Sequence, residues 1–501
     1  MLIEDAITPP TPTPEARLRT ALATALIRIE LAELRAEAAE LRAEAAEKRL
    51  GELEVIVREL KARIGKDSSN SSKPPSSDGP AAKAKKRRYK KRKPSGKKVG
   101  GQPGHKGVTR KMRPVEEADE VIHHKPTHCN NCRSGLQGAL PAADPIPHQQ
   151  LDIPPITFKL IHHWIHRLTC PNCGTINQAQ LPPQAKTGQG PDLTAWCAML
   201  IGKYRLSREQ VAALLADLTG VKMSKSTVHA CWERMGKALE KPMAELEGAL
   251  PSAPVVNLDE TGWREGGAKR WLWIAVAPLF VVFCVHARRS AAVLRRWFPD
   301  GYEGQVGSDR WSAYHLFDIR HRQLCWAHLG RDLQGIIDDG GVGAAAAQEM
   351  RLGEGRMFSS WWACKANEIS RSELGEQTSA YRRQFYSFCE CGSKQTGDDG
   401  WRRLGKDLLK KWPAVFNFLD RNDIDPTNNA AERGLRGSVI WRRTTQGTRT
   451  SEGSVYASRM LSVAETCRKQ GRDILDFLRC AMVAHLGGTD PPSLLAPTAT
   501  P

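Results

Sequence analysis

A series of short apolar segments between residues 251 and 326 limits the folds open to this chain more than any other feature. The segment Val255–Leu258 leads to Asp259, and a later one, Gly304–Gly307, leads to Asp309. The rest of the pattern predicts two strands around a proline, an amphipathic helix, a turn and a last strand. These are Trp271–Ala277, Phe280–Val285, Ser290–Phe298, the turn at Tyr314 and His321–Trp326. Such an order indicates a mixed α/β sheet.

Three strands, a helix, a strand, a helical turn and a strand is the order of the ribonuclease H-like fold. Acids at the end of its first strand and after its fourth strand come together across the sheet. We therefore expect Asp259 and Asp309 to be neighbours, and two such carboxylates repel each other at roughly 4 to 6 Å unless a cation neutralises them. Oxygen ligands favour Mg²⁺ or Mn²⁺. The pattern predicts a divalent metal site.

The third candidate acid is Glu432, near the start of an expected helix at Asn429. A third carboxylate allows two ions to act on the attacking and leaving oxygens of a phosphodiester. Each acid also has a structural interpretation: Asp259 as a strand-end turn residue, Asp309 as a helix cap, and Glu432 as the third residue of a capping box. Taken together, with the strand order around them, the three acids favour metal ligation.

Positive charge is concentrated in one segment. Fifteen of the 74 Lys and Arg residues, and none of the 55 Asp and Glu residues, lie between Gly79 and Arg113, so the rest of the chain has a net charge of +4. The Ser-, Lys- and Gly-rich composition of residues 66–118 predicts a disordered linker. Uniform positive charge suits neutralisation of nucleic-acid phosphates, although a solubilising tail is the alternative. The expected DNA contacts are Lys83, Lys85, Lys86, Arg87, Arg88, Lys90, Lys91, Arg92 and Lys93.

Residues 15–65 predict a long helix, rich in Leu, Ala, Glu, Arg and Lys and without proline after residue 14. Apolar residues recur at alternating spacings of three and four, which indicates a coiled coil with a frame shift near Ala45. The seam comprises Ile27, Leu31, Leu34, Ala38, Leu41 and Ala45, followed by Ala46, Leu50, Leu53, Val57, Leu60 and Ile64. A solitary charged helix, or one docked on its own chain, is the alternative.

Four of the 13 cysteines form two C-x-x-C pairs, Cys129 with Cys132 and Cys170 with Cys173. Two such pairs complete the tetrahedral shell that Zn²⁺ favours, so residues 119–190 are expected to form a structural zinc ribbon. The loop between the pairs is long, and a strand at Phe158–Leu168 is expected to return the second pair to the first. A redox pair is disfavoured because the flanking sequence lacks a βαβ pattern.

Residues 191–248 predict a helical region with a helix-turn-helix. Ser207 and Gln210 form a capping-box pattern, Gly220 ends that helix, and a second helix follows Ser224. Ser226, Thr227 and His229 on the second helix are the expected DNA contacts. An ordinary helical hairpin is the alternative.

Six separated motifs resemble the transposase of the insertion sequence 66 family, in the same order, from about Leu34 to about Leu486. They are Ser71–Asp78 (SSKPPSSD), Gly100–Gly107 (GGQPGHKG), Cys170–Gly174 (CPNCG), Leu258–Trp263 (LDETGW), Cys325–His328 (CWAH) and Asn428–Arg436 (NNAAERGLR). The resemblance implies a DDE transposase with a metal-bound acidic triad of Asp259, Asp309 and Glu432. It also implies an insertion between the second and third acids. The catalytic domain is then 251–486, with a helical insertion at about 333–424 and a disordered tail at 487–501.

Two positions depart from the family pattern. The usual Asp-Gly is Asp309-Arg310 here, which is expected to narrow the approach to the second acid, and the usual basic residue after the CWAH motif is Gly330 followed by Arg331. Neither departure removes an acid, so an active enzyme is expected.

The function predicted from these features is DNA transposition by metal-dependent phosphoryl transfer at the terminal inverted repeats and a target DNA. Arg433 and Arg436 are expected to contact phosphate, or else to form an exposed helical face. His328 has either an accessory role or a place in the core.

We expect a homo-oligomer, element-encoded accessory proteins and a bacterial cytoplasmic location at the nucleoid. Membrane contact is not expected, because the longest apolar run contains Pro278 and is too short to span a bilayer. The alternatives are a nuclease of the same fold without strand transfer and a catalytically silent DNA-binding regulator.

Overall fold

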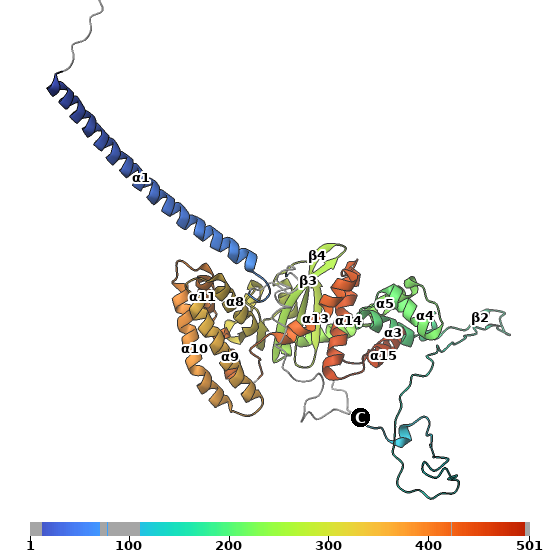
Figure 1. Ribbon diagram of the computed structural model, residues 1–501. Helices are drawn as coiled ribbons and strands as arrows, with labels where there is room; N and C mark the ends of the chain where they lie inside the picture. The colour runs from blue at the N-terminus through green and yellow to red at the C-terminus, as the bar shows by residue number, and fades with distance from the viewer. Residues whose placement is uncertain (1–12, 71–77, 79–110, 422, 496–501) are drawn as a thin grey trace, which may run out of the picture.

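The computed structural model describes residues 13–70, 78, 111–421 and 423–495. Helix α1 (Pro14–Gly65) is a single 52-residue helix that projects from the rest of the molecule (Figure 1). The segment after it meets helix α8 (Trp326–Asp339), where Asn70 Nδ2 donates to Asp338 Oδ2 at 2.7 Å. The side chains of Ile27, Leu31, Leu34, Ala38, Leu60 and Ile64 in the expected seam lie outside the described residues. Most of the basic linker also lies outside them, including Lys83 to Lys93.

We name residues 191–421 and 423–495 the body. A five-stranded sheet in the order β5-β4-β3-β6-β7 forms its centre. Its strands are β3 (Val255–Glu265), β4 (Ala268–Val276), β5 (Val281–His286), β6 (Gln305–Ser308) and β7 (Arg322–Leu324). Strands β3, β4 and β5 are antiparallel neighbours, whereas β6 is parallel to both β3 and β7. The predicted order of strands is therefore confirmed.

Two predicted strand ends are wrong. Strand β3 does not end at Asp259, because its antiparallel pairing with β4 continues to Glu265, opposite Ala268. Strand β7 stops at Leu324, since Cys325 is the N-cap residue of α8 and Trp326 begins that helix. The expected helix between β5 and β6 is present as α7 (Ala292–Trp297).

Helix α14 (Ser451–Gln470) covers the outer edge of β5 with a row of hydroxyl groups. Ser458, Ser462 and Thr466 stand four residues apart, and their hydroxyl oxygens accept hydrogen bonds from β5 backbone N–H groups at 3.1, 2.8 and 3.0 Å. An edge strand normally exposes such groups to other chains. Helix α14 satisfies them within the molecule.

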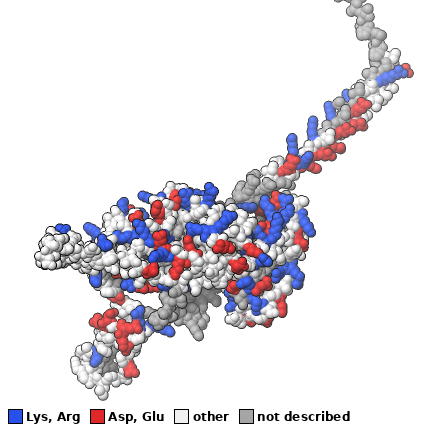
Figure 2. All heavy atoms as spheres, turned by 180° about the vertical axis from the view of Figure 1, so that it is seen from behind, with Lys and Arg blue, Asp and Glu red and all other residues white. Residues whose placement is uncertain are grey.

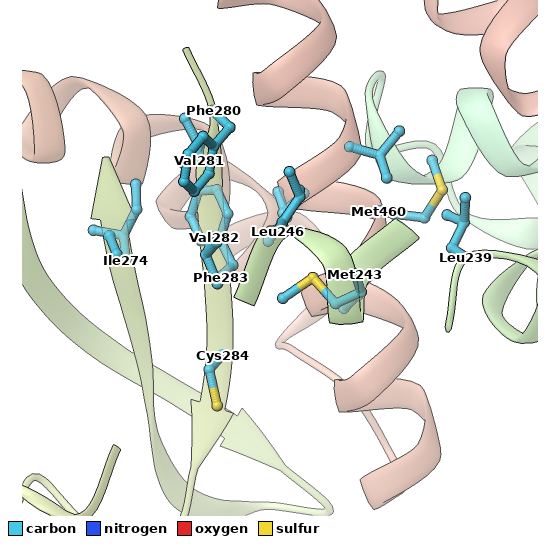
Figure 3. Packing of buried hydrophobic residues seen from close by; sticks show 14 of the residues in the cluster. Leu239, Met243, Leu246, Ile274, Phe280, Val281, Val282, Phe283, Cys284 and Met460 are labelled. Atoms are coloured by element: carbon cyan, nitrogen blue, oxygen red, sulfur yellow. The ribbon is translucent and has the colours of Figure 1, made fainter. Parts of the chain in front are cut away.

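The helices before the sheet share one hydrophobic core with it. They are α3 (Pro191–Gly202), α4 (Arg208–Thr219), α5 (Lys225–Ala238) and α6 (Glu240–Ala249), packed with α14 and α15 (Ile474–Gly487). Figure 3 shows residues of β5 beside Met243 and Leu246 of α6, with Met460 of α14 nearby. The boundary expected near residue 250 therefore does not separate two hydrophobic cores.

The segment predicted to be a helical insertion is helical and has a second core. It begins within α8, seven residues after the start of that helix, and contains α9 (Ala344–Lys365), α10 (Arg371–Ser393), α11 (Asp399–Lys410) and α12 (Asn417–Asp420). Trp326, Phe385 and Phe416 meet at its centre, with ring centroids 5.1 to 6.0 Å apart. Figure 1 shows these helices on the opposite side of the sheet from α3 to α5.

Helix α13 (Asn429–Thr445) returns the chain to the sheet, where it packs on β3 and β4. Asn428, just before it, is 1% exposed and donates its Nδ2 to the carbonyl oxygen of Leu258 at 2.7 Å. Its backbone N–H donates to Cys325 Sγ at 3.1 Å. One residue thus joins β3, α8 and α13 at a single point.

The surface in Figure 2 carries both signs of charge, mixed over the face that the view shows. Within the described part of the chain, no helix combines the length and the apolar character needed to cross a membrane.

Candidate active site

Asp259 on β3 and Asp309, the residue directly after β6, lie at matching positions of two neighbouring parallel strands. The β3–β6 register pairs Asn257 with Gly307, so each aspartate stands two residues beyond the last pair. Both side chains are half-buried. Asp259 lies inside β3, so the alternative of a strand-end turn residue is wrong for it. Asp309 Oδ1 accepts a hydrogen bond from the Trp311 N–H at 2.8 Å, which shapes the turn after β6.

Glu432 reaches the same region from the first turn of α13. Helix α13 has Asn428 as its N-cap residue and no side-chain capping bond, so the capping-box interpretation of Glu432 is wrong. Arg331 Nη2 lies 3.3 Å from Glu432 Oε1, and His328 Nδ1 lies 3.7 Å from the same oxygen. Arg331 therefore supplies the positive charge beside the third acid, although Gly330 stands where the family has its basic residue.

The three acids interact electrostatically. Burial raises the pKa of Asp259 well above its usual value, and the carboxylates of Glu260, Asp309 and Glu432 raise it further. A bound cation would relieve this repulsion and favour the ionised carboxylates. The charge of the acid set therefore suits a divalent metal ion, although the three carboxylates do not all lie within 4.8 Å of one another in the described structure.

An ion pair with a buried carboxylate stands directly beside Asp259. Glu260 is 8% exposed, pairs with Arg289 and accepts a hydrogen bond from the Tyr314 hydroxyl. The Arg289 guanidinium lies between two tryptophan rings, 5.0 Å from the centroid of Trp271 and 4.1 Å from that of Trp311. The network links β3, β4 and the turn after Asp309. Sequence reasoning missed it, because no spacing in the chain relates Arg289 to Glu260.

Arg310 does not narrow the approach to Asp309, which corrects the expectation drawn from its place in the sequence. Its guanidinium points to the helical insertion and pairs with Asp332 of α8 at 2.7 Å and Asp407 of α11 at 2.8 Å. Two half-buried carboxylates outcompete the solvent for this cation. Arg310 therefore fastens the turn that carries Asp309 to the second core.

His328 is half-buried beside Glu432, and its Nδ1 has no hydrogen-bond partner. Burial, together with the charges of Arg331 and Arg310, lowers the pKa of His328 to about 3, so the ring is neutral at pH 7. Cys325, His328 and Glu432 have ligand atoms within 4.8 Å of one another, and they are the one such His/Cys/Asp/Glu group among the described residues. The neutral ring thus faces the site rather than the core.

Each C-x-x-C pair forms a tight turn. The Cys129 N–H donates to the Ser134 carbonyl at 2.8 Å and the Cys170 N–H to the Thr175 carbonyl at 2.9 Å, so the two turns repeat one geometry. Hydrogen bonds from Ser134 and then Cys129 lower the pKa of Cys132 to about 7, and Thr175 lowers the pKa of Cys173. Both pairs therefore suit thiolate ligation.

The two turns are not brought into one four-cysteine shell in the described structure. The strand expected at Phe158–Leu168 is also wrong, since only β1 (Arg167–Thr169) forms, paired with β2 (Ile176–Gln178). Local hydrogen bonds suffice for each turn, whereas joining turns across a long loop draws on the free energy of metal binding.

The expected DNA contacts of the helix-turn-helix are partly engaged within the protein. The predicted capping box of Ser207 and Gln210 is confirmed, and Gly220 ends α4 with φ 75°. On α5, Ser226 is exposed, while Thr227 is half-buried and shares a 2.9 Å hydroxyl contact with Ser224. His229 lies 3.5 Å from Glu233. Arg433 and Arg436 on α13 are exposed.

Comparison with known families identifies the class. The model of the "Transposase IS66 family" matches residues 186–456, more than half of the chain, and that of the "zinc-finger binding domain of transposase IS66" matches residues 126–174. A family of unknown function matches residues 23–111. The chain therefore belongs to the IS66 transposase family, and its zinc-finger domain supports a structural zinc ion.

Relatives in Sinorhizobium fredii carry no assigned function. Uncharacterized protein y4jO is 26% identical over 32% of this chain and 48% of its own length, so the chain spans about half of that relative. Uncharacterized proteins y4qI and y4hP are each 24% identical, over 73% and 70% of this chain and 71% and 69% of their own lengths.

Proposed function

We propose that this chain is a DDE transposase whose catalytic unit has a ribonuclease H-like fold, with Asp259, Asp309 and Glu432 as its acids. The strand order β5-β4-β3-β6-β7 supports the fold. The observation that carries the site is the proximity of the acids: Asp309 stands at the register position that matches Asp259, and after burial and Glu260 it is Asp309 and Glu432 that raise the pKa of Asp259. Family membership supports DNA transposition as the reaction class.

Asp259, Asp309 and Glu432 would hold Mg²⁺ or Mn²⁺, which when bound activates the attacking oxygen and stabilises the leaving oxygen of a phosphodiester. Arg331 orients Glu432, and the neutral His328 can accept a proton or a hydrogen bond beside it. Hydrolysis at an element end frees a 3′-hydroxyl, and that hydroxyl attacks a target phosphodiester in line. No serine or tyrosine nucleophile is needed.

The N-terminal parts would recognise the element ends and pair two chains, since strand transfer must hold two ends at once. We infer that Cys129, Cys132, Cys170 and Cys173 close around one Zn²⁺ ion, because the two turns are equivalent and four thiolates complete its shell. Residues 83–93 and α5 would contact DNA, α1 would form the coiled coil, and proteins encoded beside the gene would assist.

The test needs the inverted repeats that flank the gene, placed on a labelled DNA fragment with Mg²⁺ and a target plasmid. Asp259→Asn should lower cleavage and strand transfer by at least ~10³-fold, since it removes a charge that stabilises the transition state. Asp300→Asn, an exposed aspartate of the same domain, is the matched control and should keep wild-type rates. Mn²⁺ binding measured by electron paramagnetic resonance should weaken in Asp259→Asn and not in Asp300→Asn.

Three results would change the proposal. Unaltered cleavage by Asp259→Asn would remove this residue from the site. Cleavage without joining by the wild type would indicate a nuclease of the same fold, and end binding without cleavage would indicate a regulator.

A further inference from the structure

Six arginines from four separate segments gather at one place on the body, which we name the arginine cluster. Its members are Arg205, Arg208, Arg264, Arg442, Arg443 and Arg449. They come from the turn between α3 and α4 together with the first residue of α4, the end of β3, the last turn of α13 and the loop before α14. None of the six belongs to any ion pair within 4.0 Å formed by the described residues.

Backbone contacts hold these segments side by side. The Thr448 N–H donates to the Arg264 carbonyl at 3.0 Å, so the loop that carries Arg449 lies against the end of β3. Arg442 Nη1 donates to the Gly262 carbonyl, which fastens α13 to the same strand. Arg205 adopts a left-handed backbone with φ 66°, and its guanidinium packs on α13 where a side chain at Gly437 would stand.

The cations are close enough to act on one another. Burial and then Arg449 lower the pKa of Arg208, although Glu233 and Glu209 oppose this. Burial, Arg443 and Arg264 lower the pKa of Arg442. Folding has therefore brought like charges together without an ion pair to offset their repulsion. This repulsion does not stabilise the folded chain.

Helix dipoles account for only part of the cluster. Arg442 and Arg443 lie in the last turn of α13, where positive charge is favourable. Arg208 occupies the first turn of α4, and Arg449 precedes the N-cap residue of α14, where positive charge is unfavourable. An external anion explains all six positions together.

The cluster lies between the helix expected to read DNA and the proposed active site. Trp441 of α13 packs edge-on against Trp232 of α5 at 6.0 Å and Trp263 of β3 at 6.1 Å, so these elements form one rigid unit. Along α13, Arg443 stands 11 residues after Glu432, which corresponds to roughly 17 Å, about half a turn of duplex DNA. The exposed Arg433 and Arg436 lie between them.

We infer that the arginine cluster binds the phosphate backbone of double-stranded DNA and guides it along α13 from the helix-turn-helix toward Glu432. The binding part stands on the cluster alone, whereas the direction toward a cut bond rests on the proposed function. Spaced guanidinium groups suit successive phosphates.

The test measures binding of the full-length protein to a fluorescein-labelled 30-bp DNA duplex of arbitrary sequence, as a function of KCl concentration. Arg208→Gln/Arg443→Gln/Arg449→Gln changes three exposed members. Because each neutralised phosphate contributes about 0.9 to the slope of log K against log salt, the triple variant should lower that slope by about two to three. The contribution of the basic linker is the same in every variant.

Two controls separate the cluster from net charge and from misfolding. Arg356→Gln/Arg383→Gln/Arg403→Gln removes three exposed arginines from the helical insertion and should leave the slope unchanged. Arg208→Lys/Arg443→Lys/Arg449→Lys keeps the charge. This variant should recover at least two thirds of the slope that the glutamine variant loses. A glutamine variant with the wild-type slope would overturn the inference, as would an equal loss in the insertion variant or a larger loss for a 30-bp RNA duplex than for DNA.

Asp300→Asn, the exposed aspartate outside the site, should bind this duplex with the wild-type slope, and cleavage is measured separately on the element-end fragment. If the wild type never cleaves while the glutamine variant still loses slope, the proposed function fails and the arginine cluster stands.

Discussion

Two tryptophans illustrate how differently the body and the N-terminal third of this protein are built. Trp441 in the body is 4% exposed and lies between Trp232 and Trp263, whereas Trp164, in the segment between the two cysteine pairs, is 82% exposed. In α1, Leu41 is 67% exposed. The body thus buries its apolar residues within one chain, while the N-terminal third presents them to whatever binds there. Metal, partner helix and DNA are the candidates.

Zinc removal should separate the two regions most strongly. A structural zinc ion contributes about 10 to 16 kcal/mol to the folding of its domain, so a chelator, or Cys170→Ser/Cys173→Ser, should unfold residues 119–190 completely. The body does not use these thiolates, so its thermal midpoint should stay the same. Limited proteolysis with mass spectrometry, beside calorimetry, measures both, and metal analysis should find one zinc ion per chain.

Cys391→Ser, at an exposed cysteine outside the two pairs, is the control and should change neither readout. A body that melts together with the cysteine turns would show that the two regions are not independent.

The tryptophans themselves give the next largest effect. Trp441→Ala should lower the free energy of unfolding of the body by about 3 to 5 kcal/mol, because it removes a large buried side chain and leaves a cavity. Trp164→Ala, at an exposed position, should change it by less than ~0.5 kcal/mol. Urea unfolding followed by circular dichroism measures both. Equal effects would contradict the contrast between the regions.

The same contrast explains which parts of the structure could be predicted from sequence. The order of the strands could be predicted because alternating and continuous apolar runs report burial within the chain, as in Val255–Leu258. The continuation of β3 to Glu265 could not be predicted, since its polar end is held by pairing with β4 and by contacts to α13 and the loop before α14, which are distant in the sequence. The strand expected at Phe158–Leu168 failed because the described part of the chain leaves most of its apolar residues uncovered; Leu160 is 83% exposed.

Parts of the site were hidden for a related reason. Asp259 and Asp309 could be paired because a parallel register follows from strand order. Arg289 and Arg310 reach their partners by side chains across the fold, to Glu260 and to Asp332, and no local pattern records such contacts. The Asp-Arg departure at 309 and 310 was visible in the sequence, but its role depended on the placement of α8 and α11.

Pairing of α1 with a second copy is the next prediction. Leu41→Glu/Leu53→Glu should weaken self-association by at least 10-fold, because each leucine buried in a seam is worth about 1.5 to 3 kcal/mol and a charge there must be desolvated. Analytical ultracentrifugation measures the association constant. Leu352→Glu, at a leucine that is 59% exposed on α9, is the matched control and should leave assembly unchanged. A wild-type monomer at micromolar concentration would refute the coiled coil.

Two matched capping boxes give the smallest effect and test whether the body unfolds as one unit or two. Ser207 caps α4 in the core shared with the sheet, and Ser370 caps α10 in the core of the insertion, and each serine N–H donates in return to the side chain of the third helical residue. Ser207→Ala and Ser370→Ala should each cost about 0.5 to 2 kcal/mol, since an N-terminal backbone N–H loses its acceptor. Hydrogen exchange read by mass spectrometry should then show faster exchange in the core that carries the change. If either substitution speeds exchange equally in both cores, Arg310 and the α8 junction couple them into one cooperative unit, and the division of the body into two cores is structural but not energetic.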